Sequence, residues 1–319
     1  GRNTKNGGGI HMNILVTGGA GFIGSHLTDG LIAEGHHVII IDNLSTGSRK
    51  NLNPKAVFYE EDIRHAEALD RIFAKEKIQI VFHEAAQTLV PYSMEHPKED
   101  AELNIMGLIN VLDMCRKYHA EKIIFSSSAA VYGDNLHVPL KEDQPLMPTS
   151  FYGLTKVTAE KYIQMYHDVF GLSYAILRYS NVYGERQGSH GEGGVVYVFS
   201  KALAQGRDLT IYGDGEQSRD FIYVKDVARA NIKAMDASVP SGIYNVSTAI
   251  ETTINALKEI LLYFSRVPVQ VSHAEARSGD IYRSALDNTA AKQVLQWKPA
   301  TKLLPGLQAT YSYFVEEES

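Results

Sequence analysis

The 319-residue chain lacks three features that would direct its interpretation elsewhere. Its only cysteine, Cys115, excludes an internal disulfide and is typical of a reducing compartment, so we expect a cytoplasmic protein with Cys115 in its core. The sequence contains no run near the roughly 18–20 apolar residues that span a bilayer. A formal net charge of -6 argues against binding to nucleic acid phosphates. We therefore expect neither a membrane nor a nucleic acid partner.

Short apolar runs alternate with segments of helical periodicity along the chain. Continuous apolar strands separated by helices predict a parallel sheet covered on both faces, which is a doubly wound, Rossmann-like α/β fold. Residues 1–11 are rich in Gly and Asn, and we interpret them as an expression remnant, expected to be disordered, before a natural start at Met12. The expected strands are residues 14–16, 38–41, 57–59, 80–82, 123–125 and 174–177, and the expected helices include residues 25–34, 66–75, 103–118 and 152–170.

The rhythm changes after about Asn181, where glycines and polar residues dominate residues 184–194 and shorter elements follow, including a strand at 209–212. We expect residues 12–180 to form the nucleotide-binding domain with the catalytic residues. Residues 181–319 are expected to form mainly a smaller C-terminal substrate-binding lobe over the carboxyl edge of the sheet. Because no Pro/Ser-rich linker separates the two parts, we expect them to be intimately joined, with the chain free to cross back.

A glycine-rich segment joins the first expected strand to the first helix. Gly18, Gly21 and Gly24 are spaced GxxGxxG, which permits a tight turn, a close approach of pyrophosphate to the backbone, and contact between helix and strand. The amides of Phe22 and Ile23 at the helix N-terminus are then available to phosphate. The sequence predicts a dinucleotide site here.

Acidic residues at the ends of the next two strands indicate which dinucleotide binds. Asp42, followed by Asn43, lies 18 residues past Gly24, where a carboxylate suits the ribose hydroxyls and repels a 2′-phosphate. We therefore predict NAD and not NADP. Asp62, followed by Ile63 after the third strand, either approaches the adenine or caps a helix, and both readings stay open.

A Tyr/Lys pair provides the candidate chemistry. Tyr152 and Lys156 form a YxxxK pair on one face of a helix. A nearby ammonium and a cationic nicotinamide would lower the pKa of the tyrosine toward working pH, and the lysine would also hold the nicotinamide ribose. Ser128, at the carboxyl end of the fifth strand, is placed to bridge the phenol and a substrate hydroxyl. These three are the predicted catalytic residues, and no metal site is expected.

Five segments carry a resemblance to a known family over nearly all of residues 12–319: TGGAGFIGSHL, SSSAAVYG, YGLTK, RYSNVYG and GDGEQSRDFIYVKD. The sequence resembles the extended short-chain dehydrogenases/reductases, and within them the UDP-galactose (UDP-glucose) 4-epimerase branch. The resemblance implies an enzyme that oxidises C4 of a UDP-hexose, lets the 4-ketone rotate, and returns the hydride to the opposite face. Related dehydratases and decarboxylases carry an acid where this chain has Ala129 and Ala130. Since alanine cannot transfer a proton, we expect the chemistry to stop at the 4-ketone.

The resemblance also assigns the substrate residues. Arg219 and Arg277 match the diphosphate-binding arginines of the family, Asn181 matches its substrate-binding asparagine, and Asp280 is placed to contact the uridine ribose. Ser284 is small where hexose-restricted epimerases can carry a tyrosine, so we expect UDP-GlcNAc and UDP-GalNAc as substrates besides UDP-Glc and UDP-Gal.

Several positions depart from the family pattern. Glu84 stands where an apolar or amide residue is usual, Gln87 replaces a lysine found in some epimerases, and Ser180 occupies a site often filled by phenylalanine. These departures bear on the identity of the sugar more than on the reaction type. His83 is expected to be a strand-end residue with a structural hydrogen bond.

Two alternatives remain open. Arg186 would suit a UDP-glucuronate 4-epimerase if it met the C6 carboxylate, although residues 191–199 look more like the hexose branch. A protein that retains NAD without turnover is the non-enzyme alternative, which the intact Ser128, Tyr152 and Lys156 argue against. The family also implies a homodimer built on the two long helices at 103–118 and 152–170.

Overall fold

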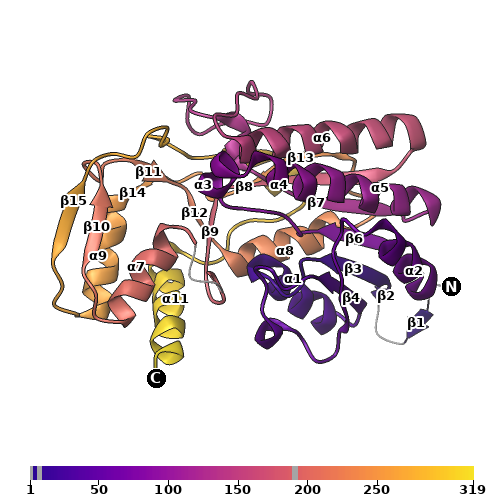
Figure 1. Cartoon of the computed structure of the whole chain (residues 1–319), viewed down its shortest axis with the longest axis horizontal. Helices are drawn as coiled ribbons and strands as arrows, with labels where there is room; N and C mark the ends of the chain where they lie inside the picture. The colour runs from indigo at the N-terminus through magenta and orange to yellow at the C-terminus, as the bar shows by residue number, and fades with distance from the viewer. Residues whose placement is uncertain (1–2, 6–8, 189–192) are drawn as a thin grey trace.

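A seven-stranded parallel sheet forms the centre of the computed structural model, which describes residues 3–5, 9–188 and 193–319 (Figure 1). All six expected strands belong to this sheet, so the predicted doubly wound α/β fold is confirmed. The strand order is β13-β8-β7-β6-β3-β4-β5. The strands are β3 (Asn13–Thr17), β4 (His37–Asp42), β5 (Val57–Glu60), β6 (Ile80–His83), β7 (Lys122–Ser128), β8 (Ser173–Tyr179) and β13 (Gly242–Val246).

Both faces of the sheet are buried, which explains why its strands read as continuous apolar runs. In β3, Ile14 and Val16 pack into one core cluster while Leu15 packs into the other, because successive side chains of a strand point to opposite faces. Helices α1 (Phe22–Ala33) and α8 (Val224–Ala234) cover the first face. The second face is covered by α2 (Ala66–Glu76), α5 (Gly107–Lys117) and α6 (Phe151–Phe170).

The chain crosses back to the sheet after the predicted domain border. Residues beyond Asn181 contribute α8 and the edge strand β13, which pairs in parallel with β8, and α10 (Thr289–Val294) packs near them. Sequence spacing did not single out β13, because its run Gly242–Val246 includes a glycine and a buried asparagine, Asn245.

A smaller lobe lies beside the carboxyl edge of the sheet, at the left of Figure 1. Its core packs three helices around a two-stranded parallel sheet, and two short strand pairs connect it to the main body. The helices are α7 (Val195–Ala204), α9 (Ile254–Ser265) and α11 (Leu303–Glu317). The pairs are β10 (Leu209–Tyr212) with β15 (Val271–Ala274), β9 (Asn181–Tyr183) with β12 (Phe221–Tyr223), and β11 (Ser218–Arg219) with β14 (Thr252–Thr253).

Short elements complete the fold. Among the first eleven residues, which we expected to be disordered, β1 (Asn3–Lys5) and β2 (Gly9–His11) pair in antiparallel fashion, a difference from that expectation. None of the helices in the described ranges combines the length and hydropathy needed to cross a membrane. The remaining elements are the 3-10 turns η1 (Arg49–Asn51) and η3 (Ala129–Tyr132), the helices α3 (Val90–Glu95) and α4 (Pro97–Ala101), and the π-helical turn η2 (Glu102–Met106).

Candidate active site

The glycine-rich turn between β3 and α1 has the geometry that a dinucleotide requires. Gly18 has φ +72°, and a Cβ there would lie 2.8 Å from the amide nitrogen of Ala85, so only glycine lets these two backbone segments approach. A Cβ on Gly24 would lie 2.2 Å from the Gly18 carbonyl oxygen. Gly21 occupies the N-cap of α1, and within the described chain no side chain caps this helix or places an acid in its first turn. The first-turn amides therefore remain available to phosphate, and the residues present fit NAD.

The two acidic residues behind this turn are held differently. Asp42 is buried at the end of β4, where its carboxylate accepts hydrogen bonds from the amides of Ala20 (3.0 Å) and Leu44 (2.8 Å). Burial raises the pKa of Asp42. Asp62 accepts hydrogen bonds from the guanidinium of Arg64 at 2.7 and 2.9 Å and from Asn43 Nδ2 at 3.1 Å, and this lowers its pKa.

The helix-cap reading of Asp62 is wrong. His65 occupies the N-cap position of α2, and the carboxylate of Asp62 instead accepts a hydrogen bond from the amide of Arg64, 2.8 Å away. The adjacent Ile63 is buried against the second core cluster, where its side chain lies so close to Gly107 that a Cβ at Gly107 would come within 2.6 Å of it.

The structure brings Ser128, Tyr152 and Lys156 together at the carboxyl edge of the sheet. Ser128 ends β7 and caps η3 by accepting a hydrogen bond from the amide of Ala130 at 3.1 Å. Tyr152 is the second residue of α6 and interacts with the Ser128 side chain. Lys156 lies one turn further along α6, with Nζ 5.7 Å from the Tyr152 ring centroid.

A glycine sets the approach of α6 to this edge. A Cβ at Gly153 would lie 2.7 Å from the carbonyl oxygen of Ala130, so a larger residue would push α6 away from η3. The N-terminus of α6 is fixed by Ser150, whose hydroxyl accepts a hydrogen bond from the amide of Gly153 at 3.0 Å. Tyr152 is therefore placed beside the segment that follows Ser128.

The pKa of Tyr152 differs from the sequence-based expectation. Burial raises the pKa of Tyr152 to about 12; the bond to Ser128 lowers it, and the charge of Asp100 raises it further. Burial also lowers the pKa of Lys156 to about 8. The expected lowering of the tyrosine pKa thus does not come from the polypeptide alone, because desolvation of the phenol outweighs its polar contacts.

A second buried network, which the sequence analysis missed, holds the same end of α6. Asp100, fully buried in α4, accepts hydrogen bonds from Gln87 Nε2 (2.8 Å) and Asn104 Nδ2 (3.1 Å). Asn104 lies in the π-helical turn η2 and also donates to the hydroxyl of Thr155 at 3.1 Å. π-helical turns recur at functional sites, but the spacing of apolar residues in the sequence does not predict them. Gln87, which departs from the lysine of some relatives, is part of this network.

An ion pair anchors α6 to the sheet on the other side. Arg178 in β8 is 1% exposed and donates to Glu160 of α6 at 2.6 and 3.0 Å. The hydroxyl of Ser127 donates to the same carboxylate at 2.6 Å. The guanidinium also donates to Tyr132 of η3, 3.0 Å away. Since Glu160 is one turn beyond Lys156, this pair fixes the rotation of the helix that carries the predicted catalytic side chains.

Two single predictions on individual residues are confirmed. His83 is 2% exposed at the end of β6, its Nδ1 hydrogen-bonds the hydroxyl of Thr17 at 2.8 Å, and burial lowers its pKa to about 3. A histidine that stays neutral in this way is structural. Cys115 is buried in the second core cluster, and burial raises the pKa of its thiol to about 12.

The predicted diphosphate and uridine residues gather in the lobe. Arg219 of β11 is largely buried, and its guanidinium donates to Asp280, 3.0 Å away. Burial lowers the pKa of Arg219, while the charge and hydrogen bond of Asp280 and, less strongly, the charge of Asp134 raise it. Arg277 is exposed and lies over the Tyr212 ring, with Cζ 3.9 Å from the centroid. Asn181 is exposed at the start of β9.

Asp220, between the predicted Arg219 and an apolar strand, is a structural residue that sequence reasoning missed. It is fully buried and accepts hydrogen bonds from the hydroxyls of Ser180 (3.0 Å) and Thr248 (2.6 Å) and from the amide of Leu286 (3.2 Å). It thereby joins the ends of β8 and β13 to the segment carrying Ser284, which is 8% exposed. Ser180, at the position often filled by phenylalanine in the family, thus binds the Asp220 carboxylate.

The structure does not place Arg186 as the uronate alternative requires. Its guanidinium pairs with Asp29 of α1 at 2.9 Å and lines a pocket of about 180 Å³ with Tyr313 and Glu317 of α11. The residues lining this pocket include none of the predicted catalytic or diphosphate-binding side chains. Residues 189–192, which cover the start of the hexose-like segment 191–199, lie outside the described residues.

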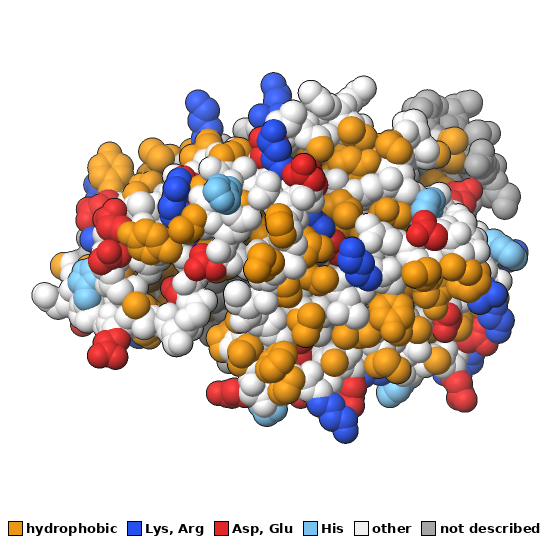
Figure 2. Space-filling view, turned by 90° about the horizontal axis from the view of Figure 1, so that it is seen from above, with side chains coloured by type: hydrophobic (Ala, Val, Ile, Leu, Met, Phe, Trp, Pro, Cys, Tyr) orange, Lys and Arg blue, Asp and Glu red, His pale blue; other side chains and the backbone are white. Residues whose placement is uncertain are grey.

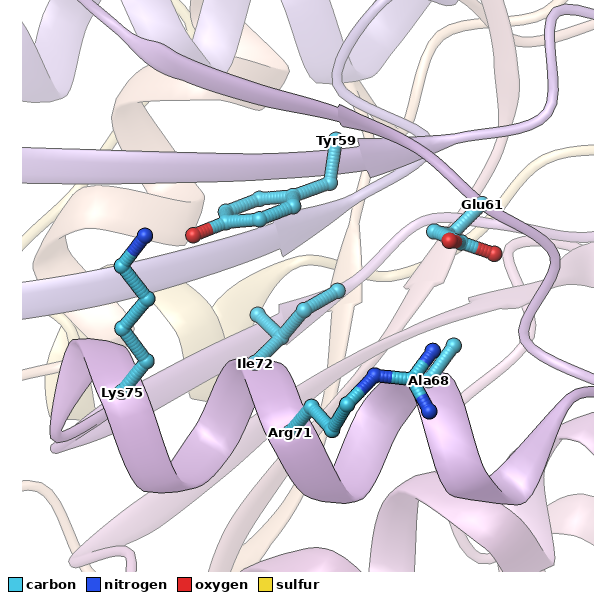
Figure 3. Close-up of a pocket in the computed structure, with 6 residues that line it drawn as sticks. All are labelled: Tyr59, Glu61, Ala68, Arg71, Ile72 and Lys75. Carbon is cyan, nitrogen blue, oxygen red and sulfur yellow. The ribbon is translucent and has the colours of Figure 1, made fainter.

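A larger pocket, of about 270 Å³, lies at the far edge of the sheet between β5 and α2 (Figure 3). Tyr59 and the basic Arg71 and Lys75 line it, and the hydroxyl of Tyr59 donates to Glu76 at 2.5 Å. This pocket is separate from the Tyr152 site. In the parts of the chain that the structure describes, no group of three or more His, Cys, Asp or Glu side chains is arranged to hold a metal ion.

Comparison with known proteins identifies the class. The sequence profile described as the NAD dependent epimerase/dehydratase family matches residues 14–247. The putative UDP-glucose 4-epimerase of Methanocaldococcus jannaschii is 44% identical over 301 residues, covering 94% of this chain and 97% of the relative. The Thermotoga maritima UDP-glucose 4-epimerase, solved with UDP-glucose, is 43% identical with a TM-score of 0.94, covering 97% of this chain and 100% of the other.

A third relative differs in its sugar. The UDP-N-acetylglucosamine 4-epimerase of Methanobrevibacter ruminantium M1, solved with UDP-N-acetylmuramic acid, is 39% identical with a TM-score of 0.91, covering 96% of this chain and 99% of the other. The chain therefore belongs to the NAD dependent epimerase/dehydratase family and is an NAD-dependent enzyme of that class. The resemblance to the UDP-galactose (UDP-glucose) 4-epimerase branch is confirmed as well.

Proposed function

We propose that this enzyme inverts C4 of UDP-hexoses, interconverting UDP-glucose with UDP-galactose and UDP-GlcNAc with UDP-GalNAc, through a 4-keto intermediate. The observation that carries the proposal is the set of side chains around Tyr152. Ser128 and Lys156 lie next to the phenol, while positions 129 and 130, in the turn packed against the N-terminus of α6, are alanines. A site so composed has a group to move the C4-hydroxyl proton but no acid in the turn where relatives carry one for elimination or decarboxylation.

Each of the three side chains has a distinct task in this proposal. The phenol of Tyr152 takes the proton of the C4 hydroxyl and later returns it. Ser128 hydrogen-bonds both the phenol and the sugar oxygen, keeping the proton path short. Lys156 supplies positive charge beside the phenol and holds the nicotinamide ribose. NAD, when bound, accepts the C4 hydride and gives it back, so it is unchanged over a full cycle.

In this proposal, the charge on the Tyr152 phenol depends on two positive neighbours, the ammonium of Lys156 and the nicotinamide ring of the cofactor. The protein alone raises the pKa of Tyr152 to about 12, which disfavours proton transfer near neutral pH. A positive charge beside a phenol lowers its pKa, and the nicotinamide ring of oxidised NAD carries one. We infer that Gly18, Gly21 and Gly24, the amides of Phe22 and Ile23, and the residues Asp42, Asn43, Asp62 and Ile63 hold this cofactor in place.

The lobe is proposed to hold the nucleotide while the sugar turns. Arg219 and Arg277 bind the diphosphate, for which a guanidinium fork is well suited, and Asp280 and Asn181 contact the rest of the substrate. The ion pair between Arg219 and Asp280 keeps both side chains close before the substrate arrives. Firm contacts to the diphosphate let the planar ketone rotate about its tether without leaving the enzyme.

The wider sugar range rests on Ser284. This buried serine stands where hexose-restricted relatives can carry a tyrosine, so it leaves room for an acetamido group. A relative named for UDP-N-acetylglucosamine at 39% identity supports the same range.

We propose further that the chain forms a homodimer through α5 and α6. Figure 2 looks onto the face of the molecule that carries these helices and shows apolar side chains spread over it. On α6, a set of large apolar residues is at least 40% exposed. A contiguous exposed apolar patch on a protein surface is typical of an interaction site. The members of this set are Phe151, Leu154, Tyr162, Met165, Val169 and Phe170. Light scattering should report twice the chain mass, and Met165→Lys should halve it; a parent that runs as a monomer at micromolar concentration would end this proposal.

Product analysis tests the function directly. The protein is incubated separately with UDP-Glc, UDP-GlcNAc and UDP-GlcA, and each product is identified by NMR. We expect the C4 epimer of the first two and no product from the third, since Arg186 pairs with Asp29. A 4-keto-6-deoxy sugar or a pentose product would contradict the proposal, and turnover of UDP-GlcA alone would favour the uronate enzyme.

A further inference from the structure

Glu84 is a half-buried acidic side chain at the edge of the site, in a place where relatives usually have an apolar or amide residue. Its amide donates to the Thr17 carbonyl oxygen at 3.1 Å, which fixes the residue directly after β6. Its carboxylate accepts a hydrogen bond from the hydroxyl of Ser126 in β7, and Tyr179 of β8 donates to it from 3.4 Å. Asn231 of α8 donates in turn to the Tyr179 hydroxyl at 2.8 Å. Two neighbouring strands therefore bind the carboxylate, and α8 supports one of its two partners.

The same serine also holds the lysine of the site. Lys156 Nζ donates to the main-chain carbonyl oxygen of Ser126 at 2.8 Å, so Ser126 links the ammonium through its backbone to the carboxylate bound by its side chain. Nζ also lies 4.8 Å from the Phe125 ring centroid. The lysine is thus held by β7, and β7 is tied to Glu84.

The titratable groups around Lys156 differ in their partners and in their charge near pH 7. Glu160, on the same helix, is held in an ion pair with Arg178, and its charge has the smallest effect of the three acids on the pKa of Lys156. Asp100 faces the site from α4, where amide groups of Gln87 and Asn104 already bind one of its oxygens. His83 is neutral near pH 7, and Tyr152 keeps its proton there. Glu84 is the acid that shares a hydrogen-bonded residue with the ammonium. Its charge, followed by those of Asp100 and Glu160, raises the pKa of Lys156 against the larger effect of burial. Burial also raises the pKa of Glu84, while the bond from Ser126 and the charge of Lys156 lower it.

We propose that Glu84 is a positioning residue that acts through Ser126 to fix the Lys156 side chain and to keep its ammonium charged during turnover. The effect on turnover rests on the proposed function, whereas the effect on the charge of Lys156 does not. Burial alone favours the neutral amine, which neither supplies positive charge to the phenol nor holds a ribose hydroxyl as firmly. A carboxylate directly after the neighbouring strand β6 offsets this effect of burial.

The test compares Glu84→Gln with the parent by two readouts. In the ligand-free protein, lysine labelled with ¹³C at Cε reports the titration of Lys156, whose resonance is identified by its loss in Lys156→Met. We expect the Lys156 pKa to fall by about one pH unit in Glu84→Gln, as for removal of one nearby opposite charge. With UDP-glucose, the alkaline limb of the kcat profile should move down by about the same amount, and KM should stay within about twofold of the parent.

Three further variants test whether Glu84 acts on Lys156 through Ser126 and by its charge. Ser126→Ala should lower the Lys156 pKa by part of the same amount, because it breaks the bond to Glu84 while keeping the main-chain carbonyl. Glu84→Asp, which retains the charge, should restore most of the parent profile. Glu259→Gln, an exposed change on α9, should leave both readouts unchanged.

Unaltered titration of Lys156 in Glu84→Gln would overturn the inference, even if activity fell, because a purely structural defect moves kcat without moving the pKa. If the parent converts no UDP-sugar but the NMR titration shifts as expected, the proposed function fails and the assignment of Glu84 stands.

Discussion

The carboxyl edge of the sheet and the proposed substrate side of the lobe differ in how firmly their polar side chains are held. Tyr152 and Lys156 are each less than a tenth exposed and are bonded to residues from several elements. Arg277, Asp280 and Asn181 are exposed, and their contacts come mainly from the lobe itself. From this difference we infer that the side chains for the chemistry are already in position in the free protein. The exposed side chains of the lobe take up their binding positions only when the UDP-sugar arrives.

The largest effect is expected at the firmly held side. Tyr152→Phe removes the hydroxyl that we propose moves the proton, so kcat should fall by about 10³-fold, within the usual range for loss of a general acid-base group. The melting temperature should change little, because the aromatic ring remains. Tyr263→Phe, at an exposed tyrosine on α9, is the matched control and should leave kcat unaltered. Retention of more than a tenth of parental kcat in Tyr152→Phe would assign the proton transfer to another residue.

A smaller effect, of a different kind, is expected in the lobe. Arg219→Ala should raise KM for UDP-glucose by roughly 10- to 100-fold, the loss of one or two charge-assisted hydrogen bonds, with kcat within a fewfold of the parent. Arg283→Ala removes an exposed arginine of the same lobe, paired with Glu251, and should change neither constant. Steady-state kinetics decide: a fall in kcat without a rise in KM would erase the contrast between the two regions.

Ser284→Tyr sharpens the contrast within the lobe. The added ring should exclude the acetamido group, lowering kcat/KM for UDP-GlcNAc by roughly 5- to 150-fold relative to UDP-glucose, since overfilling a close site costs about 1–3 kcal/mol. Ser284→Ala, which stays small, serves as the control. Undiminished turnover of UDP-GlcNAc by the tyrosine variant would show that this position does not select the sugar.

The last prediction concerns what the buried lysine costs in stability. Its pKa falls from 10.5 to about 8, which corresponds to about 3 kcal/mol against the folded state below pH 8. The unfolded chain binds more protons between pH 8 and 10.5, so this penalty is relieved as pH rises through that window. The free energy of unfolding of Lys156→Met should therefore be about 1–2 kcal/mol higher than that of the ligand-free parent at pH 7. This figure includes the loss of the hydrogen bond to Ser126.

Urea unfolding at pH 7 and pH 9.5 measures the lysine's penalty. The advantage of Lys156→Met should shrink at the higher pH and should be absent from Lys161→Met, a change on the exposed side of α6. A variant less stable than the parent at both pH values would mean that the ammonium contributes more through its contacts than burial removes.

The sequence was sufficient for the features that repeat or that need one special residue type. Alternation of apolar runs predicted six strands, and the glycine spacing predicted the turn at Gly18, because sheet burial and positive φ leave a direct trace in residue choice. The same reasoning missed β13, whose pairing with β8 depends on a contact between distant segments. It also could not join Asp100, Asn104 and Thr155, because their meeting depends on the π-helical turn.

The polar surroundings of the site were harder to predict for a related reason. Tyr152 and Lys156 were found by their spacing, but spacing did not show that burial raises the pKa of the tyrosine in the protein without its cofactor. Spacing records which charges are neighbours and not how deeply they are buried, and burial dominates here. Glu84 was noticed only as a departure from the family pattern, and its partner Ser126 gave no signal.

The most direct test of the account is the fate of the hydrogen at C4. UDP-glucose deuterated at C4 is converted by the enzyme, and the UDP-galactose product is examined by NMR and mass spectrometry. The account predicts that the deuterium remains at C4 with inverted configuration and that no deuterium enters from D₂O when unlabelled substrate is used. Exchange of the C4 hydrogen with solvent, or inversion at any other carbon, would contradict it.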